Sequence, residues 1–408
     1  MCFSSLMQFL KLNPKTITGS LLVAGTCIGG GMLALPVAAA KTGLMPTFFC
    51  MVIVWAMMTV TALCLVEVGF WMKKGDAHIM TMARSILGNW GKWLVCVLFL
   101  FISYASLTAY IAGCSHLLSE TLLTFGDMQI SKSAGCFLIT ILFGPFLVGP
   151  RTLLGKTNDI LFILMLAAYA IIIAKGIGHV ESGLLLRQDW SSIPLAVPLL
   201  ITAFSFQTMV PSLHPFLDHD RRSLRFAVIF GTIIAFCVYA LWQTIVYGSV
   251  PLEGQYGLLY ALENDMPATF SLSKVVHSEI VARAADFFAL FALLTSFFGI
   301  GMGLVDFLGD GLHIKRKGRG AFLLGCLVLV PSFIFAMSIE KIFIMALDIS
   351  GGFGDTILNG VLPVMLLLVG YKYFAPKHIK ARLHIYGYYL LMALFALAFA
   401  FEAMVRSK

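Results

Sequence analysis

Between Gly25 and Pro36 the sequence reads GTCIGGGMLALP, in the middle of its first long apolar segment. Glycine inside a helix costs about 1 kcal/mol relative to alanine, and proline lacks the N–H that would bond the carbonyl one turn earlier. The stretch therefore predicts a broken helix whose backbone N–H and C=O groups are free to bind something else. Because such groups are not tolerated in hydrocarbon, the break must lie inside the protein or beside a cavity.

A second interruption, AFSFQTMVPS from Ala203 to Ser212, lies in the middle of the sixth apolar segment. Paired broken helices are typical of transporters, in which the half-helix ends meet substrate and ions near the middle of the membrane. The alternative is that the glycines of the first stretch only let helices approach closely, as small residues do in membrane proteins.

The composition places the chain in a bilayer. Of its 408 residues 60% are hydrophobic and 12% are charged, and the mean hydropathy is +0.93, whereas soluble domains carry about 25% charged residues. The net charge of +8 comes from short basic runs between apolar segments, which indicates membrane orientation rather than a nucleic-acid partner. The nine cysteines form no CxxC pair and are read as small buried hydrophobes. The first apolar segment is too long for a cleavable signal peptide.

About 20 apolar residues cross a bilayer core, and this rule predicts an all-α integral membrane protein with eleven transmembrane helices. The predicted ranges are 16–40, 44–72, 93–123, 133–150, 158–175, 192–217, 223–249, 283–309, 320–339, 342–371 and 384–405. A short amphipathic surface helix is expected within 73–91, and 251–282 is expected to be a solvated cap.

The basic residues alternate between the connections, and most of them fall on the side of the N-terminus. The positive-inside rule therefore puts the N-terminus in the cytoplasm and, with eleven spans, the C-terminus outside. The two broken helices are five apart and would cross in opposite directions, which is the pattern of an inverted five-plus-five repeat. In a single transporter domain, residues 16–175 and 192–371 would be the repeats, with 384–405 as an extra helix. This pattern predicts a secondary transporter.

The motif Gly25-Thr26-x-Ile28-Gly29-x-Gly31-Met32-Leu33-Ala34-Leu35-Pro36 resembles the first helix of the bacterial aromatic amino acid permeases, which have the leucine-transporter-like fold. The resemblance extends to Ser205-Phe206 with Pro211, and to the run TSFFGIGMGLVDF at 295–307. It implies a multi-pass protein of the bacterial inner membrane that imports an aromatic amino acid by proton symport. Tyrosine is the favoured substrate, with a tryptophan permease or a sodium-coupled neutral amino acid transporter of the same fold as alternatives.

For such a substrate, the N–H groups of Gly29, Gly30 and Gly31 are the candidates to bind the carboxylate at the start of a half-helix. Carbonyls of Gly25, Thr26 and Ala203 are the candidates to accept from the ammonium. Near the middle of a membrane an unpaired charge costs several kcal/mol, so both ends of the substrate need partners.

The aromatic side chain of the substrate is expected to contact the second break at Phe204, Ser205, Phe206 and Gln207. Gln207 is expected to bond a phenol hydroxyl or an indole N–H. Tyr104 matches the position where the fold often places a substrate-contacting tyrosine, and Tyr110, further along the same helix, cannot face the site equally well. A phenylalanine in so apolar a chain can equally belong to the core or face lipid.

Coupling candidates are of two kinds. Thr295 and Ser296 resemble the hydroxyl pair that holds sodium in sodium-coupled members, although hydroxyls inside a helix often bond their own turn. A proton carrier needs a titratable group, and Glu67 and Lys156 are ranked first. The other candidates considered are Asp159, Asp286, Asp306, Asp348 and Asp355.

No metal, cofactor or enzyme motif is expected. His214, Asp218, His219 and Asp220 look superficially like metal ligands, but their place beside basic residues favours a solvated helix end. The proton, or alternatively sodium, is the only coupling partner expected beside the amino acid and the lipid bilayer. A channel without coupled transport is the competing class, and no oligomeric state is predicted.

Overall fold

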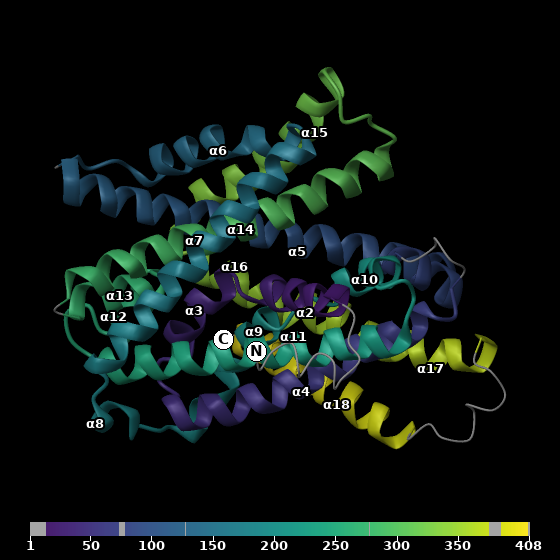
Figure 1. The fold of residues 1–408 in the computed structure, drawn as a ribbon, viewed down its shortest axis with the longest axis horizontal. Coiled ribbons are helices and arrows are strands. Elements are labelled where there is room, and N and C mark those ends of the chain that lie inside the picture. The colour runs from purple at the N-terminus through teal and green to yellow at the C-terminus, as the bar shows by residue number, and fades with distance from the viewer. Residues whose placement is uncertain (1–13, 73–77, 127, 277, 375–384, 407–408) are drawn as a thin grey trace.

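The computed structural model describes residues 14–72, 78–126, 128–276, 278–374 and 385–406. These residues form helices, with one isolated bridge between Gly43 and Gln188. In chain order the longer helices are α2 (Pro14–Cys27), α3 (Gly30–Ala38), α4 (Leu44–Gly69), α5 (Ile79–Gly126), α6 (Lys132–Val148), α7 (Arg151–Gly176), α9 (Ile193–Ala203), α10 (Val210–Phe216), α11 (Arg221–Ser249), α14 (Glu279–Leu312), α15 (Arg319–Ser338), α16 (Phe343–Ile349), the π-helix η4 (Ser350–Val361), α17 (Leu362–Phe374) and α18 (Ile385–Arg406). Figure 1 shows them packed as one bundle of mostly long helices.

Within the described residues, nine helical segments are long and apolar enough to cross a membrane, or ten if α2 and α3 count as one broken span. The helix α6 coincides with the fourth predicted segment, but it has 17 residues, fewer than the roughly 20 of a straight span. The all-helical membrane class is therefore confirmed.

Both predicted breaks are present. The helices α2 and α3 are bent by 48° at Ile28 and Gly29. The helix α9 ends at Ala203, and the short 3-10 turn η3 (Gln207–Met209) leads into α10. The first break falls in the glycine run, as helix propensity predicts, whereas Pro36 lies inside α3 and Pro211 lies at the start of α10, after the second break.

The third helix is longer than predicted, because it includes most of the expected surface helix. It begins at Ile79 and turns at Gly88, whose φ of 72° suits glycine. Ile79 and Met82 are buried, so this amphipathic segment packs on the protein. Residues 73–77 of that expectation lie outside the described residues. The fifth helix likewise starts earlier than predicted, at Arg151 directly after Pro150.

The expectation of a solvated cap at 251–282 is wrong. Two short helices, α12 (Leu258–Glu263) and α13 (Ala268–Val275), pack against α3, and α13 also packs against α14. The Asp265 carboxylate between them is buried and accepts hydrogen bonds from the backbone N–H of Phe343 at 2.6 Å and of Ile344 at 2.8 Å, at the start of α16. Burial raises the pKa of Asp265, against the lowering effect of these two N–H groups. The segment therefore closes one end of the bundle.

Candidate functional site

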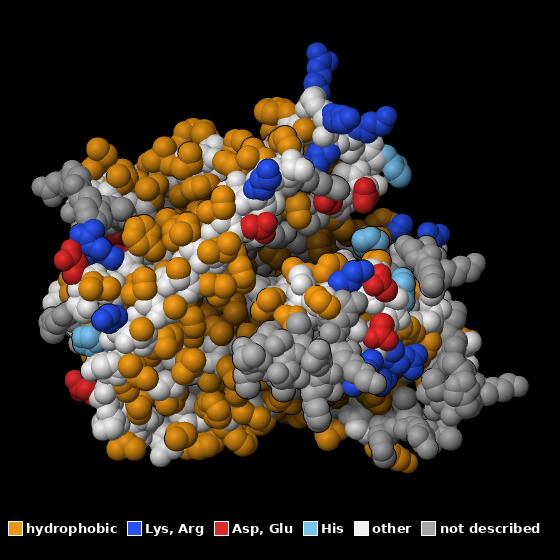
Figure 2. Space-filling view, viewed as in Figure 1, with side chains coloured by type: hydrophobic (Ala, Val, Ile, Leu, Met, Phe, Trp, Pro, Cys, Tyr) orange, Lys and Arg blue, Asp and Glu red, His pale blue; other side chains and the backbone are white. Residues whose placement is uncertain are grey.

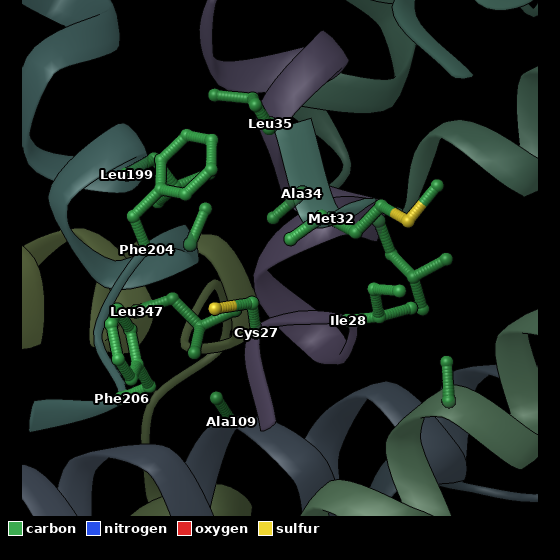
Figure 3. Packing of buried hydrophobic residues seen from close by; sticks show 14 of the residues in the cluster. Cys27, Ile28, Met32, Ala34, Leu35, Ala109, Leu199, Phe204, Phe206 and Leu347 are labelled. Carbon is green, nitrogen blue, oxygen red and sulfur yellow. The ribbon is translucent and has the colours of Figure 1, made fainter. Parts of the chain in front are cut away.

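The two helix breaks face each other in the core. An added Cβ on Gly31 would lie 3.5 Å from the Cα of Ala203, and Figure 3 shows Cys27 and Ile28 of the first break together with Phe204 and Phe206 of the second. The sequence therefore brings its two unwound stretches into one place, close to α5 and α14.

The first break is lined by one serine and one tyrosine. The N–H of Gly30, at the start of α3, donates to the Ser296 Oγ of α14 at 3.2 Å. A Cβ on Gly29 would overlap that Oγ, and a Cβ on Gly30 would lie 2.5 Å from the Tyr110 ring. The close-packing explanation thus holds for these two glycines in this conformation, whereas Gly31 has room for a methyl group. The Gly30 N–H nevertheless meets an oxygen at the break, and the positive end of a helix favours an anion there.

Three aromatic side chains of α11 bind carbonyls along the first helix. Tyr239 Oη lies 2.5 Å from the Cys27 oxygen, the Trp242 indole N–H donates to Met32 O at 2.9 Å, and the Tyr247 hydroxyl donates to Ala39 O at 2.9 Å. Pro36 cannot donate to Met32 O, so the indole satisfies a carbonyl that the helix leaves unpaired. The sequence analysis missed this group, since nothing in the sequence says which aromatic residues face helix 1.

The Ala203 carbonyl, a predicted acceptor for the ammonium, also has a protein partner. It lies 2.9 Å from the same Tyr239 hydroxyl that approaches Cys27. A hydroxyl carries one hydrogen, so at any moment one of these two carbonyls is free to accept from another donor.

Gln207, predicted to bond the substrate's polar group, has protein partners in this conformation. Its Nε2 donates to Met58 O at 3.0 Å and to Thr61 Oγ1 at 3.1 Å, both on α4, and its Oε1 accepts from the Phe206 N–H at 2.8 Å. The side chain is fully buried. In this conformation Gln207 therefore holds the second break against α4, and its polar atoms are engaged.

The structure also distinguishes the two tyrosines of α5. Tyr104 donates its hydroxyl to Leu327 O of α15 at 2.8 Å, away from the breaks. Tyr110 is buried, packs on Gly30 and is a hydrogen-bond partner of Ser296. Tyr110, rather than the predicted Tyr104, therefore lies at the first break.

Aromatic rings cover the second break. Phe204 packs edge-on against the Tyr239 ring, with 5.1 Å between centroids. Phe206 is fully buried, and Ser205 donates its hydroxyl to Ile201 O at 2.8 Å. Phe204, Ser205 and Phe206, three of the residues predicted to meet an aromatic substrate, thus pack against protein partners at this break.

The predicted coupling residues are not brought together. Thr295 donates to carbonyls of its own helix, Phe291 O at 2.9 Å and Ala292 O at 3.1 Å, and only Ser296 faces the break.

The two residues ranked first as proton carriers lie elsewhere. Glu67, near the end of α4, pairs with Arg221 at 3.1 Å and with Arg225 at 3.0 Å. Lys156 is exposed on α7. A carboxyl group that was considered but ranked lower, Asp355 of η4, is 2% exposed.

The site is covered on one side and open on the other. The helix α3 packs against α9, α12, α13 and α14, whereas α2 packs mainly against α11. Thr26 on α2 and Thr208 beside the second break are exposed. Figure 2 shows the surface hollowed next to α2. The helix α2, on the N-terminal side of the first break, therefore lies beside the hollowed surface.

The residues with a superficial metal-site pattern have other partners. The His214 ring is buried and packs on Phe70 and on His219, with 5.0 Å and 5.8 Å between ring centroids. Asp218 pairs with Lys15 at 2.8 Å, and Asp220 accepts from Ser223 N at 2.8 Å to cap α11. In the part of the chain that the structure describes, no three His, Cys, Asp or Glu side chains lie close enough to hold a metal ion.

Comparison with known proteins covers nearly the whole chain. Residues 12–402 match the tryptophan/tyrosine permease family. The "Tyrosine-specific transport system 1" of Haemophilus influenzae is 35% identical over 349 residues, which are 83% of this chain and 84% of that protein. "Tyrosine-specific transport system 2" of the same organism is 29% identical over 83% of this chain and 84% of its own. The "Tryptophan-specific transport protein" of Haemophilus influenzae is 24% identical, over 92% of this chain and 91% of that protein.

Proposed function

Because the chain belongs to the tryptophan/tyrosine permease family, we propose that it imports tyrosine across the cytoplasmic membrane by proton symport. The observation that carries the proposal is the meeting of two broken helices, with the start of α3 and the end of α9 in contact. The preference for tyrosine is supported by identities of 35% and 29% to tyrosine-specific systems, against 24% to the tryptophan-specific protein of the same organism.

The substrate carboxylate binds at the first break. It replaces Ser296 as the acceptor for the Gly30 N–H and takes further N–H groups from Gly29 and Gly31. The positive end of the α3 dipole adds about 0.3–1 kcal/mol, and about 2 kcal/mol when partly buried. The ammonium binds the carbonyls of Gly25 and Thr26, and that of Ala203 when Tyr239 gives its hydrogen to Cys27.

The side chain of the substrate lies against Phe206 and Tyr110, which flank the breaks from two sides. An edge-to-face contact between aromatic rings contributes about 0.5–1.5 kcal/mol beyond area burial. Phe204 supports the pocket from behind through its contact with Tyr239.

The architecture that goes with this function is an eleven-helix, leucine-transporter-like inverted repeat. Counting α6 as a short fourth span and each broken helix as one span gives eleven, with the N-terminus in the cytoplasm and the C-terminus outside. In this orientation the covered side, with α12 and α13, faces outward, and the hollow beside α2 faces the cytoplasm. The structure then represents an inward-facing state, and import requires the opposite side to open in turn.

The experiment that tests the function is uptake into liposomes that contain the purified protein. Labelled tyrosine is offered with a hundredfold excess of each of the twenty amino acids in turn, with and without sodium. The proposal expects competition by aromatic amino acids and uptake that follows an inward proton gradient without sodium. Competition confined to small aliphatic amino acids would refute the substrate class, and uptake that follows only a sodium gradient would refute proton coupling.

A further inference from the structure

The middle of the tenth span contains an acid whose hydrogen-bond partners, among the described residues, are uncharged. Asp355 lies in η4, within the apolar segment Phe343–Tyr373, and is 2% exposed. An ionised side chain at such depth is costly without a partner. A buried acid that is retained there needs either a cation or a role in which it is neutral for part of the time.

All hydrogen-bond partners of the Asp355 carboxyl group are neutral. Asn359 Nδ2 lies 2.6 Å from Oδ1, Ser350 Oγ lies 3.3 Å from Oδ2, and Ser205 of the second break is a third partner. The Ser205 hydroxyl is within hydrogen-bond reach of both Ile201 O and the Asp355 carboxyl group, and it carries one hydrogen. With that hydrogen on Ile201 O, the Ser205 oxygen can accept from a protonated carboxyl, and with the hydrogen turned to Asp355 it donates to a carboxylate.

The same partners can also serve the ionised form. The Asn359 amide has both a donor and an acceptor, and its Oδ1 is buried without a hydrogen-bond partner. Rotation of the amide would present this oxygen to a protonated carboxyl, whereas the observed orientation presents the NH₂ to a carboxylate. Asn359 and Ser350 therefore accommodate both protonation states without a cation.

The titratable groups around Asp355 are few. The helices that pack on η4 are α4, α5, α9, α16, α17 and α18. Of their titratable side chains, Tyr110 of α5 faces Asp355, Glu402 of α18 is buried against Gly352, and Asp348 of α16 is half-buried. The helix α9 contributes no titratable residue, Glu67 of α4 pairs with arginines, and Lys372 lies near the end of α17.

Asp355 is also connected to the second break. The helix η4 packs on α9, and the Thr202 hydroxyl at the end of α9 donates to Leu347 O of α16 at 2.9 Å. Ser205, two residues beyond the Ala203 carbonyl, contacts Asp355 directly. A rearrangement of the second break upon substrate binding therefore changes the surroundings of this carboxyl group.

We propose that Asp355 is the group that binds and releases the co-transported proton. This assignment rests on the proposed proton symport. The carboxylate takes one proton from hydronium on the outer side, and the resulting carboxyl O–H donates a hydrogen bond to the Ser205 oxygen in the occluded state. It gives the same proton to water on the inner side, so that one proton crosses per substrate and the protein is unchanged at the end of the cycle.

The test compares Asp355→Asn with the wild type in liposomes under two conditions. With a one-unit inward pH gradient and the membrane potential clamped at zero, one proton per tyrosine gives about tenfold accumulation at equilibrium. We expect tenfold accumulation by the wild type and none by Asp355→Asn. Counterflow exchange of labelled tyrosine, which needs no net proton movement, should stay within about threefold of the wild type, because asparagine mimics the neutral carboxyl.

Glu402→Gln is the matched control, since it neutralises a second buried acid packed on the same helix, and it should accumulate tyrosine as the wild type does. Accumulation of tyrosine by Asp355→Asn would overturn the assignment. Loss of both exchange and accumulation in this variant would also overturn it, because Asp355 would then have a structural role. Failure of the wild type itself to respond to the pH gradient, with exchange intact, would instead refute the proposed proton symport.

Discussion

The indole of Trp242 offers a direct test of how the broken first helix is stabilised. Trp242→Phe removes the N–H that donates to Met32 O at 2.9 Å and leaves that carbonyl buried. An unsatisfied buried polar group costs about 1–3 kcal/mol, and loss of the larger ring adds a packing penalty. The free energy of unfolding in detergent micelles, from a denaturant titration, should fall by at least this amount.

A double-mutant cycle separates the hydrogen bond from the packing. Pro36→Ala supplies the missing N–H one turn after Met32, so the carbonyl gains a partner within its own helix. In this background Trp242→Phe should cost about 1 kcal/mol less than in the wild type, because only the packing penalty remains. An equal cost in both backgrounds would show that the indole does not compensate for the proline, and the explanation would be wrong.

The remaining predictions concern the site and one helix cap. Gly30→Val should abolish tyrosine uptake while the protein still reaches the membrane, because the valine side chain would collide with the Tyr110 ring. Gly31→Ala, which has room for a methyl group, should retain uptake. Wild-type transport by the valine variant would contradict the site. Tyr110→Phe removes the hydroxyl that bonds Ser296 at the first break, and it should raise the Kd for tyrosine about two- to tenfold. Tyr104→Phe should leave this Kd unchanged in the same binding assay. Asp220→Ala should lower the free energy of unfolding at neutral pH by about 0.5–2 kcal/mol. Hydrogen bonds from Ser223 lower the pKa of Asp220 in the folded protein. The stability that Asp220 contributes is therefore present above the pKa of the unfolded state and is lost as the pH falls through the pKa of the folded state. A pH-independent difference in stability between the variant and the wild type would argue against the cap.

Local chemistry made the breaks and most spans predictable. Gly29, Gly30 and Gly31 act on their own helix, so their effect on the first break can be read without knowing any neighbour. Most predicted spans begin and end close to the observed helices, because apolar length alone decides which segments cross the bilayer.

The partners of individual side chains could not be predicted in the same way. Tyr104 and Tyr110 differ only in the direction in which each leaves α5, and the packing of α14 and α15 decides which of them meets the break. Gln207 has the same chemistry whether it binds a ligand or α4, and the position of Met58 decides between the two. The segment 251–282 is expected to be solvated, but its Asp265 accepts hydrogen bonds from the first N–H groups of α16. These partners are far away in the sequence, so no local pattern reveals the contact.

The shared hydroxyl of Tyr239 has a kinetic consequence. Its oxygen is within hydrogen-bond distance of both Cys27 O and Ala203 O, so a torsional rotation of the O–H bond transfers the single hydrogen from one helix end to the other. No donor is left without an acceptor during this exchange, and the barrier is that of a hydroxyl rotor rather than of a broken hydrogen-bond network. The two unwound helix ends can therefore shift relative to each other with a small activation free energy at this contact, and the slow step of a turnover must lie in larger motions elsewhere.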